Sequence, residues 1–174
     1  MANKVFTGTR KVATTDYNDV KFVGQTKDGR EVVIELDNAI NMSGIDWKLV
    51  DKDEVVASIE YTGTYTENDT TNSEPWRVTY VDGTATGTKK PSNMLLGEGS
   101  FYIGTVCVGC CRGGGQFSVE RKYRDVKVDG DMGSVMGRIA LDSSIPKLKI
   151  NMLEIISANL TKLYPATQIT DATV

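Results

Sequence analysis

The most reactive side chains of the sequence form one short cluster. Cys107, Cys110 and Cys111 lie in the run Val-Cys-Val-Gly-Cys-Cys. A Cys-x-x-Cys pair can serve as a redox centre or as half of a zinc site, but a structural zinc needs four ligands. The sequence offers neither a second such pair nor any histidine. Because the cysteine count is odd and no secretory leader is expected, we predict free thiols at a strand end.

The glycine run that follows could in principle cradle a phosphate. Arg112-Gly113-Gly114-Gly115 lacks the Gly-Lys-Ser/Thr ending of a P-loop and leads into an expected strand instead of a helix N-terminus. We therefore predict a tight turn or a bulge here.

Two acidic groups could be mistaken for metal or acid/base sites. Asp51, Asp53 and Glu54 surround Lys52, and Asp129-Gly130-Asp131 does not match the spacing of an EF-hand loop. Both are predicted to be charged turns. Trp47 and Trp76 could form a sugar-binding platform, but aromatic residues at alternating strand positions more often belong to the core.

The whole composition argues against catalysis and nucleic-acid binding. The 174 residues include no histidine, so the commonest general base and metal ligand is missing. With 20 Lys+Arg against 23 Asp+Glu, the net charge of −3 does not favour phosphate binding. We expect a non-enzymatic, intracellular, soluble protein with no cofactor and no metal. No apolar run approaches the ~20 residues of a membrane span, so no membrane contact is expected.

The elements that must position these residues are mainly strands. From Val55 to Tyr65 every second residue is apolar or small, which predicts a half-buried antiparallel strand. Asp28-Gly29 predicts a short hairpin between two further strands. In chain order, the predicted strands are Val20–Gln25, Glu31–Leu36, Val55–Tyr65, Trp76–Val81, Phe101–Val108, Phe117–Asp129 and Lys147–Glu154.

One helix and three long loops complete the expected architecture. Ser157 is expected to cap a helix over Ala158–Tyr164, which Pro165 ends. The predicted loops are Thr66–Pro75, Asp82–Asn93 and Gly130–Ser144. The predicted fold is all-β: an antiparallel β-sandwich or flattened barrel with one short flanking α-helix.

Three blocks in the second half of the chain resemble a known family. Phe117–Gly130 is a charged strand that ends in Val-Asp-Gly, Gly133–Arg138 reads Gly-Ser-Val-Met-Gly-Arg, and Lys147–Ile155 contains Asn-Met-Leu-Glu. Together they resemble the major tail tube proteins of long-tailed bacteriophages. Ser134 stands where the family pattern has proline.

The first half of the chain resembles the same family, but the two halves stand in the reverse of the family's order. Asp19–Gly24, Asp37–Ala39, Asp51–Glu54 and Tyr61–Trp76 resemble the family's second half, whereas residues 94–174 resemble its first half. A circular permutation, natural or engineered, accounts for this order. Residues 1–174 would then be one tail-tube-like domain in which residues 1–81 and 94–174 are joined by a linker at 82–93.

The resemblance implies a structural role. Members of the family form hexameric rings that stack into a tube, work with other tail proteins, and let DNA pass through the lumen without specific binding. The implied location is the virion, with assembly in the host cytoplasm. The alternative is a β-sandwich module of a tail tip or baseplate that binds carbohydrate or another surface ligand.

The loop after the charged strand is the predicted inter-subunit contact. Its apolar side chains would gain burial only in an assembly. The assembly loop consists of Gly130, Asp131, Met132, Gly133, Val135, Met136, Gly137, Arg138 and Ile139.

Overall fold

The fold is all-β, as predicted. The computed structural model describes residues 4–9, 11–27, 29–48, 55–67, 73–80, 95–109, 111–130, 132–154 and 160–171. Strands contain 60% of the residues and helices 6%. Every strand pair in the described ranges is antiparallel. No helix in these ranges is long and apolar enough to cross a membrane.

The elements follow the chain in this order: β1 (Lys4–Gly8), a 3-10 turn (Thr14–Asp16), β2 (Asn18–Thr26), β3 (Glu31–Asn41), β4 (Trp47–Lys48), β5 (Val56–Thr62), β6 (Trp76–Tyr80), β7 (Leu95–Ile103), β8 (Val106–Cys107), β9 (Cys111–Asp125), β10 (Ile139–Met152), α1 (Leu160–Leu163) and β11 (Thr167–Asp171).

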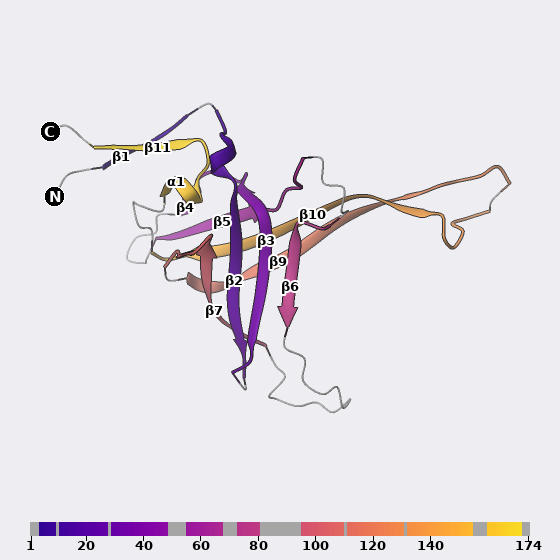
Figure 1. The fold of residues 1–174 in the computed structure, drawn as a ribbon, viewed down its shortest axis with the longest axis horizontal. Helices are drawn as coiled ribbons and strands as arrows, with labels where there is room; N and C mark the ends of the chain where they lie inside the picture. Colours follow the sequence, from indigo (N-terminus) through magenta and orange to yellow (C-terminus); the bar gives the residue numbers. More distant parts are fainter. Residues whose placement is uncertain are drawn as a thin grey trace.

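The main strands form two groups that cross each other (Figure 1). One group has the order β8-β7-β2-β3, with β6 on the other side of β3; the second has the order β5-β10-β9, with β4 on the other side of β5. Strand β3 belongs to both, because its end at Ile40 and Asn41 pairs with β5. This arrangement is a sandwich-like fold with a shared corner strand.

The corner of β3 depends on a β-bulge. The register of β2 and β3 shifts between Asn18 and Val20, and Asn38 opposite has a positive φ of 47°. Asparagine tolerates this left-handed conformation better than most residues. The backbone N–H of Asn38 donates to the Asp19 carboxylate at 3.1 Å, and the Thr64 hydroxyl donates to the Asn38 carbonyl at 2.7 Å. These contacts fix the bend that brings the two groups together.

The core follows the alternation predicted for β5. Ala57, Ile59 and Tyr61 are buried, and the residues between them are half-buried. The other buried members of the core include Leu36, Phe101, Ile103, Leu148, Ile150 and Met152. The core therefore lies between the two groups of strands.

The short helix closes one end of this core. Leu160 and Leu163 are buried, and Tyr164 follows before Pro165. The Asn41 amide donates to the Leu163 carbonyl at 2.8 Å, and the buried Tyr61 hydroxyl donates to the Lys162 carbonyl at 3.0 Å. Two core side chains thus satisfy helix carbonyls that have no partner within so short a helix.

A two-stranded ribbon of β1 and β11 was not predicted. The register runs from Lys4 opposite Asp171 to Gly8 opposite Thr167. Phe6 packs edge-on against Tyr164 with ring centroids 6.1 Å apart. The ribbon therefore holds the first and last described segments side by side (Figure 1).

Three sequence predictions need correction. Phe101–Val108 is not one strand: the chain turns at Gly104, whose φ is +58°, and returns as β8. Strand β9 begins earlier, at Cys111, and ends at Asp125. The predicted loop Gly130–Ser144 is shorter, because Ile139–Ser144 pairs with β9 and is strand. In each case the backbone pairing extends or ends where the side-chain pattern gave no signal.

Several predictions fall on residues outside the described ranges. They concern Cys110, Asp51–Glu54, residues 68–72 of the Thr66–Pro75 loop, the linker Asp82–Asn93, Asp131, and the helix cap at Ser157.

Candidate functional site

Strands β9 and β10 continue past the body of the protein as a hairpin. Strand β5 pairs with β10 only from Lys147 to Met152, whereas β9 pairs with β10 from Ile139 onward. The outer part, Glu120–Ile145, is named the arm here. Figure 1 shows it projecting far from the rest of the chain. Beyond its foot, where Arg121 and Ser144 contact the body, the arm has no further strand beside it in the described structure, so both of its faces are exposed there.

The loop at the end of the arm is tied down by its own residues. The Val126 N–H donates to the Arg138 carbonyl at 3.0 Å, which closes the tip loop, Val126–Arg138. The Ser134 hydroxyl donates to the Asp125 carboxylate at 2.7 Å. Gly130 and Gly137 have positive φ values of 94° and 87°, which glycine adopts without strain. The tip loop is therefore a defined turn.

One face of the arm carries exposed apolar side chains, which the polar Arg121–Ser144 pair separates from the core. Residues paired across two strands share a face, and alternate residues of a strand share it too. Tyr123 opposite Leu141 therefore lies on the same face as Phe117 opposite buried Leu148. Ile139 is 59% exposed and Tyr123 57%. Tyr123, Ile139 and Leu141 are named the apolar stripe.

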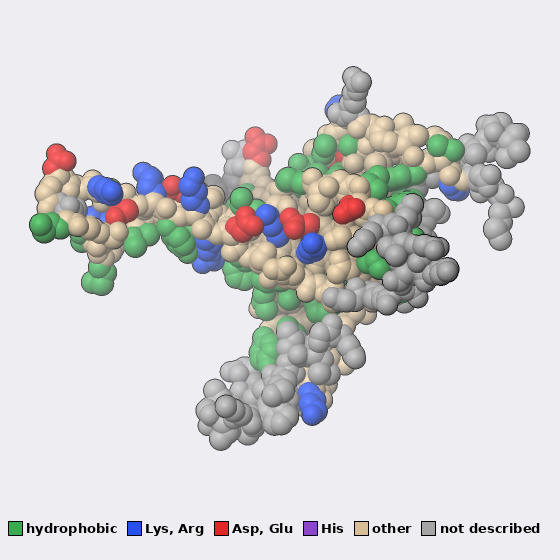
Figure 2. Space-filling model, turned by 180° about the vertical axis from the view of Figure 1, so that it is seen from behind, with side chains coloured by type: hydrophobic (Ala, Val, Ile, Leu, Met, Phe, Trp, Pro, Cys, Tyr) green, Lys and Arg blue, Asp and Glu red, His purple; other side chains and the backbone are tan. Residues whose placement is uncertain are grey.

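The two long sides of the arm, as they appear in Figure 2, carry different kinds of side chain. Figure 2 shows hydrophobic side chains gathered along one edge and most of the Lys and Arg side chains along the other. Arg124 pairs with Asp142 at 3.0 Å, and Lys147 pairs with Glu120 at 2.8 Å. Exposed pairs of this kind contribute little to stability, so their main effect is to keep that side hydrated.

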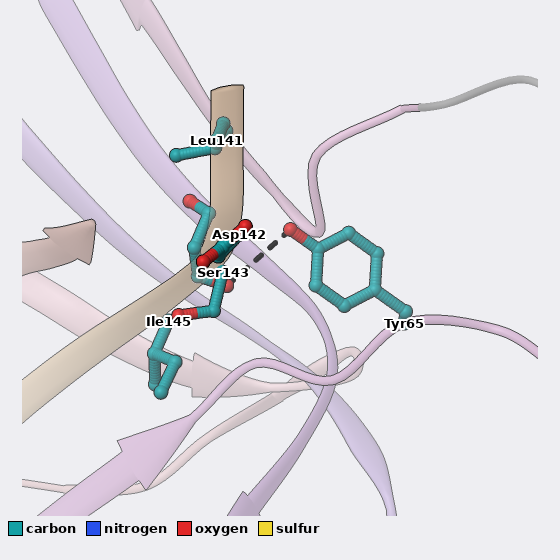
Figure 3. Close-up of a pocket in the computed structure, with 6 residues that line it drawn as sticks. Tyr65, Leu141, Asp142, Ser143 and Ile145 are labelled. Atoms are coloured by element: carbon teal, nitrogen blue, oxygen red, sulfur yellow. Dashed lines mark hydrogen bonds between the residues drawn. The ribbon is translucent and has the colours of Figure 1, made fainter. Parts of the chain in front are cut away.

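A pocket of about 290 Å³ lies where the arm leaves the body (Figure 3). It is lined by Tyr65, Leu141, Asp142, Ser143, Ser144 and Ile145, and is named the foot pocket. The register of β10 against β9 shifts between Leu141 and Ser143, so Asp142 is the extra residue of a bulge. The bulge bends β10 and opens this hollow.

A polar cluster fixes the segment beside the foot pocket. The Tyr65 hydroxyl donates to the Ser144 carbonyl at 3.3 Å and to the Glu74 carboxylate at 3.2 Å. The Trp76 indole N–H donates to Glu74 at 3.3 Å, and Arg121 lies 3.7 Å from the same carboxylate. The Arg121 guanidinium also lies over the Trp76 ring at 5.9 Å.

The charges of this cluster shift two pKa values in opposite directions. The pKa of Glu74 is lowered, most of all by the nearby Ser144 hydroxyl and then by Tyr65, Trp76 and Arg121. Burial and the Glu74 carboxylate raise the pKa of Tyr65. The Ser144 hydroxyl is itself buried and makes no hydrogen bond of regular geometry, although it is close enough to influence Glu74.

The predicted assembly loop lies at the far end of the arm. The structure places Met132, Val135 and Met136 in the tip loop, where all three side chains are exposed and the two methionines fully so. Gly130, Gly133, Gly137 and Arg138 lie in the same turn, Ile139 begins β10, and Asp131 is outside the described residues. The sequence did not indicate the foot pocket, because Tyr65 and β10 are far apart in the chain.

The other chemical candidates have structural explanations. Cys107 is an exposed free thiol at a strand end, as predicted, and Cys111 is exposed at the start of β9. The glycine run is a bulge, because Gly115 pairs with Ile150 and Cys111 with Met152. No group of three or more Cys, Asp or Glu side chains in the described part could hold a metal ion.

The two tryptophans do not share one set of contacts. The Trp47 indole N–H donates to the Tyr164 hydroxyl at 2.9 Å. Trp76 packs on Phe117 with ring centroids 5.7 Å apart and bonds to Glu74. Each indole is thus engaged by a different part of the fold.

Comparison with protein-family models, with curated proteins and with solved structures finds no match to this chain. The arm, with its tip loop and foot pocket, is therefore the feature from which a function is argued.

Proposed function

We propose that the chain is the repeating structural subunit of a bacteriophage-type tail tube. Copies assemble into hexameric rings, and the rings stack into a hollow cylinder that conducts DNA. The observation that supports this proposal is the arm, whose apolar stripe lies exposed beyond the body of the protein. Covering each half-exposed side chain contributes on the order of 1 kcal/mol, repeated in every subunit.

The resemblance to tail tube proteins is concentrated on the same feature. Val128-Asp129-Gly130 and Gly133–Arg138 lie in the tip loop, and Lys147–Met152 is the inner part of β10. Ser134, which replaces the family's proline, ties the loop to Asp125 by its hydroxyl. Of the three blocks in the second half that carry the resemblance, two thus lie mainly in the arm, and the third continues β10 into the body.

The electrostatics suit a channel that does not retain its cargo. The net charge of −3 gives the wall no excess of cations for DNA phosphates, which are the source of sequence-independent affinity. The proposal places the protein in the virion, built in the host cytoplasm beside other tail proteins. DNA passes through the lumen without specific binding.

The test is electron microscopy of the purified protein at raised concentration. We expect tubes or hexameric rings from the wild-type chain. In the variant, residues 127–137 are replaced by Asn-Gly, which joins Val126 to Arg138 as a two-residue hairpin turn. This variant should keep its circular dichroism spectrum and melting temperature but form no tubes.

Two results would contradict the proposal. Normal tubes from the shortened arm would show that the tip loop is not an assembly contact. Discrete wild-type monomers at every concentration would favour the alternative, a surface-binding module that uses the exposed Trp47. Lys27→Ala is the control, because this exposed residue lies in the turn between β2 and β3, outside the arm, and the change should leave assembly unchanged.

A further inference from the structure

The tip of the arm presents exposed apolar side chains, and its foot carries a hollow. At the tip, Met132 and Met136 extend fully exposed side chains from a turn that is held by hydrogen bonds. At the foot, the bulge at Asp142 leaves a hollow with apolar walls from Leu141 and Ile145. Methionine is unbranched and adapts to irregular cavities, so it suits such a hollow.

The foot pocket lies beside an unpaired strand edge. The outer edge of β10, from Ile139 to Ile145, has no paired strand within the described ranges. The backbone N–H and C=O groups along such an edge can pair with a segment of another chain. An occupant of the foot pocket can therefore bond to this edge as well.

The tip of a chain cannot reach its own foot pocket. Strand residues rise about 3.3 Å each, so the pocket lining on β10 begins about 10 Å from Arg138, at Leu141, and ends about 23 Å from it, at Ile145. The continuous β9–β10 pairing between them keeps the arm extended. Only a second molecule can bring a tip to this pocket.

We propose that the tip loop of one copy seats Met132 and Met136 in the foot pocket of a second copy. This inference rests on the proposed function and names the surfaces that meet. Two overlapping arms also cover Tyr123 and Ile139 of the apolar stripe, whose third member, Leu141, lines the foot pocket. Because tip and foot are different surfaces, the contact is head-to-tail, and each copy offers a free tip and a free foot for the next.

Cysteine cross-linking tests the contact directly. Cys107, Cys110 and Cys111 are first changed to serine. One chain then carries Met136→Cys at the tip, and a second, of different tagged length, carries Ser143→Cys at the foot. Mixing them under mild oxidation should give a disulfide-linked heterodimer. The matched control carries Ser118→Cys on β9, outside the pocket. Its disulfide with Met136→Cys should form at least about tenfold more slowly, because proximity sets the effective concentration of the two thiols.

The outcomes separate this inference from the proposed function. Selective cross-links in tubes or rings support both, and selective cross-links in a preparation that never forms them support only the tip-to-foot contact. Tubes or rings with equal reaction at Ser143→Cys and Ser118→Cys would overturn the contact and leave the proposed function standing. No assembly and no selective cross-link would overturn both.

Discussion

At the scale of single residues, Glu74 holds together the foot of the arm. Its carboxylate accepts hydrogen bonds from Tyr65 and Trp76 and lies near Arg121, so three separate segments meet at one charge. Its lowered pKa means that the folded state binds a proton less readily than the unfolded chain does. The stabilisation is therefore present above the unfolded pKa and is lost as the pH falls through the folded pKa.

The first prediction follows from the lowered pKa of Glu74. Glu74→Gln should reduce the free energy of unfolding by about 0.5–1 kcal/mol at pH 7, because the carboxylate is partly exposed and screened. The difference between wild type and variant should shrink below about pH 4 as the wild-type carboxyl takes up a proton. Urea unfolding followed at several pH values measures it. Tyr65→Phe, which removes one donor to the same carboxylate, should reproduce part of the effect; a pH-independent difference would contradict the assignment.

At the scale of elements, the four-residue helix α1 is too short to be stable alone. Its buried leucines and the two side-chain donors to its carbonyls hold it in place. Tertiary contacts therefore stabilise this helix, and a substitution in the core strand β5 should lower the stability of α1 as well.

The second prediction uses this dependence. Tyr61→Phe keeps the buried ring but leaves the Lys162 carbonyl without its donor, which should cost about 1–2 kcal/mol of unfolding free energy. Hydrogen exchange of the Tyr164 amide, which bonds to the Leu160 carbonyl at 2.9 Å, should accelerate selectively. Tyr123→Phe on the exposed arm is the matched control and should change neither quantity. Equal effects of the two substitutions would argue against the role of the Tyr61 hydroxyl.

The same elements show what could be predicted from the sequence. Alternation was a reliable signal for β5, because one of its faces is buried along the whole strand. It failed for Ile139–Ser144, where only Ser144 is buried and most of the other side chains are exposed. The β1–β11 ribbon was missed because its pairing joins segments at opposite ends of the chain, and local patterns carry no record of such a pairing.

The candidate site was predictable only in part. Apolar residues such as Met132 and Met136 in a glycine-rich turn pointed to the tip loop. The foot pocket depends on a bulge at Asp142 and on Tyr65. Tyr65 lies in the connection between β5 and β6, and its hydroxyl donates to the Ser144 carbonyl on β10. Neither a register shift nor a contact over that separation leaves a periodic signal in the sequence.

At the scale of the whole molecule, the β1–β11 ribbon bears on the proposed reordering of the two halves. Lys4 lies directly opposite Asp171 in an antiparallel pair, so two residues suffice to connect them as a hairpin. The connection would close a loop whose ends already meet, which limits its entropic cost. A chain that runs from β11 into β1 is thus compatible with every strand pairing in the described structure.

The last prediction concerns that chain. A reordered protein joins Asp171 to Lys4 through Asn-Gly and begins and ends within residues 82–93. It should fold to the same strands, with a free energy of unfolding within about 1 kcal/mol of the wild-type order, because no described pairing is broken. Circular dichroism and urea unfolding measure this, and microscopy shows whether its assemblies match those of the wild type.

Closure through Asn-Gly between Gly8 and Thr167, which deletes the ribbon and with it Phe6, is the control and should be less stable. If the reordered chain fails to fold while this control folds, the ribbon is not a natural junction between the two halves, and the permutation is the wrong account of their order.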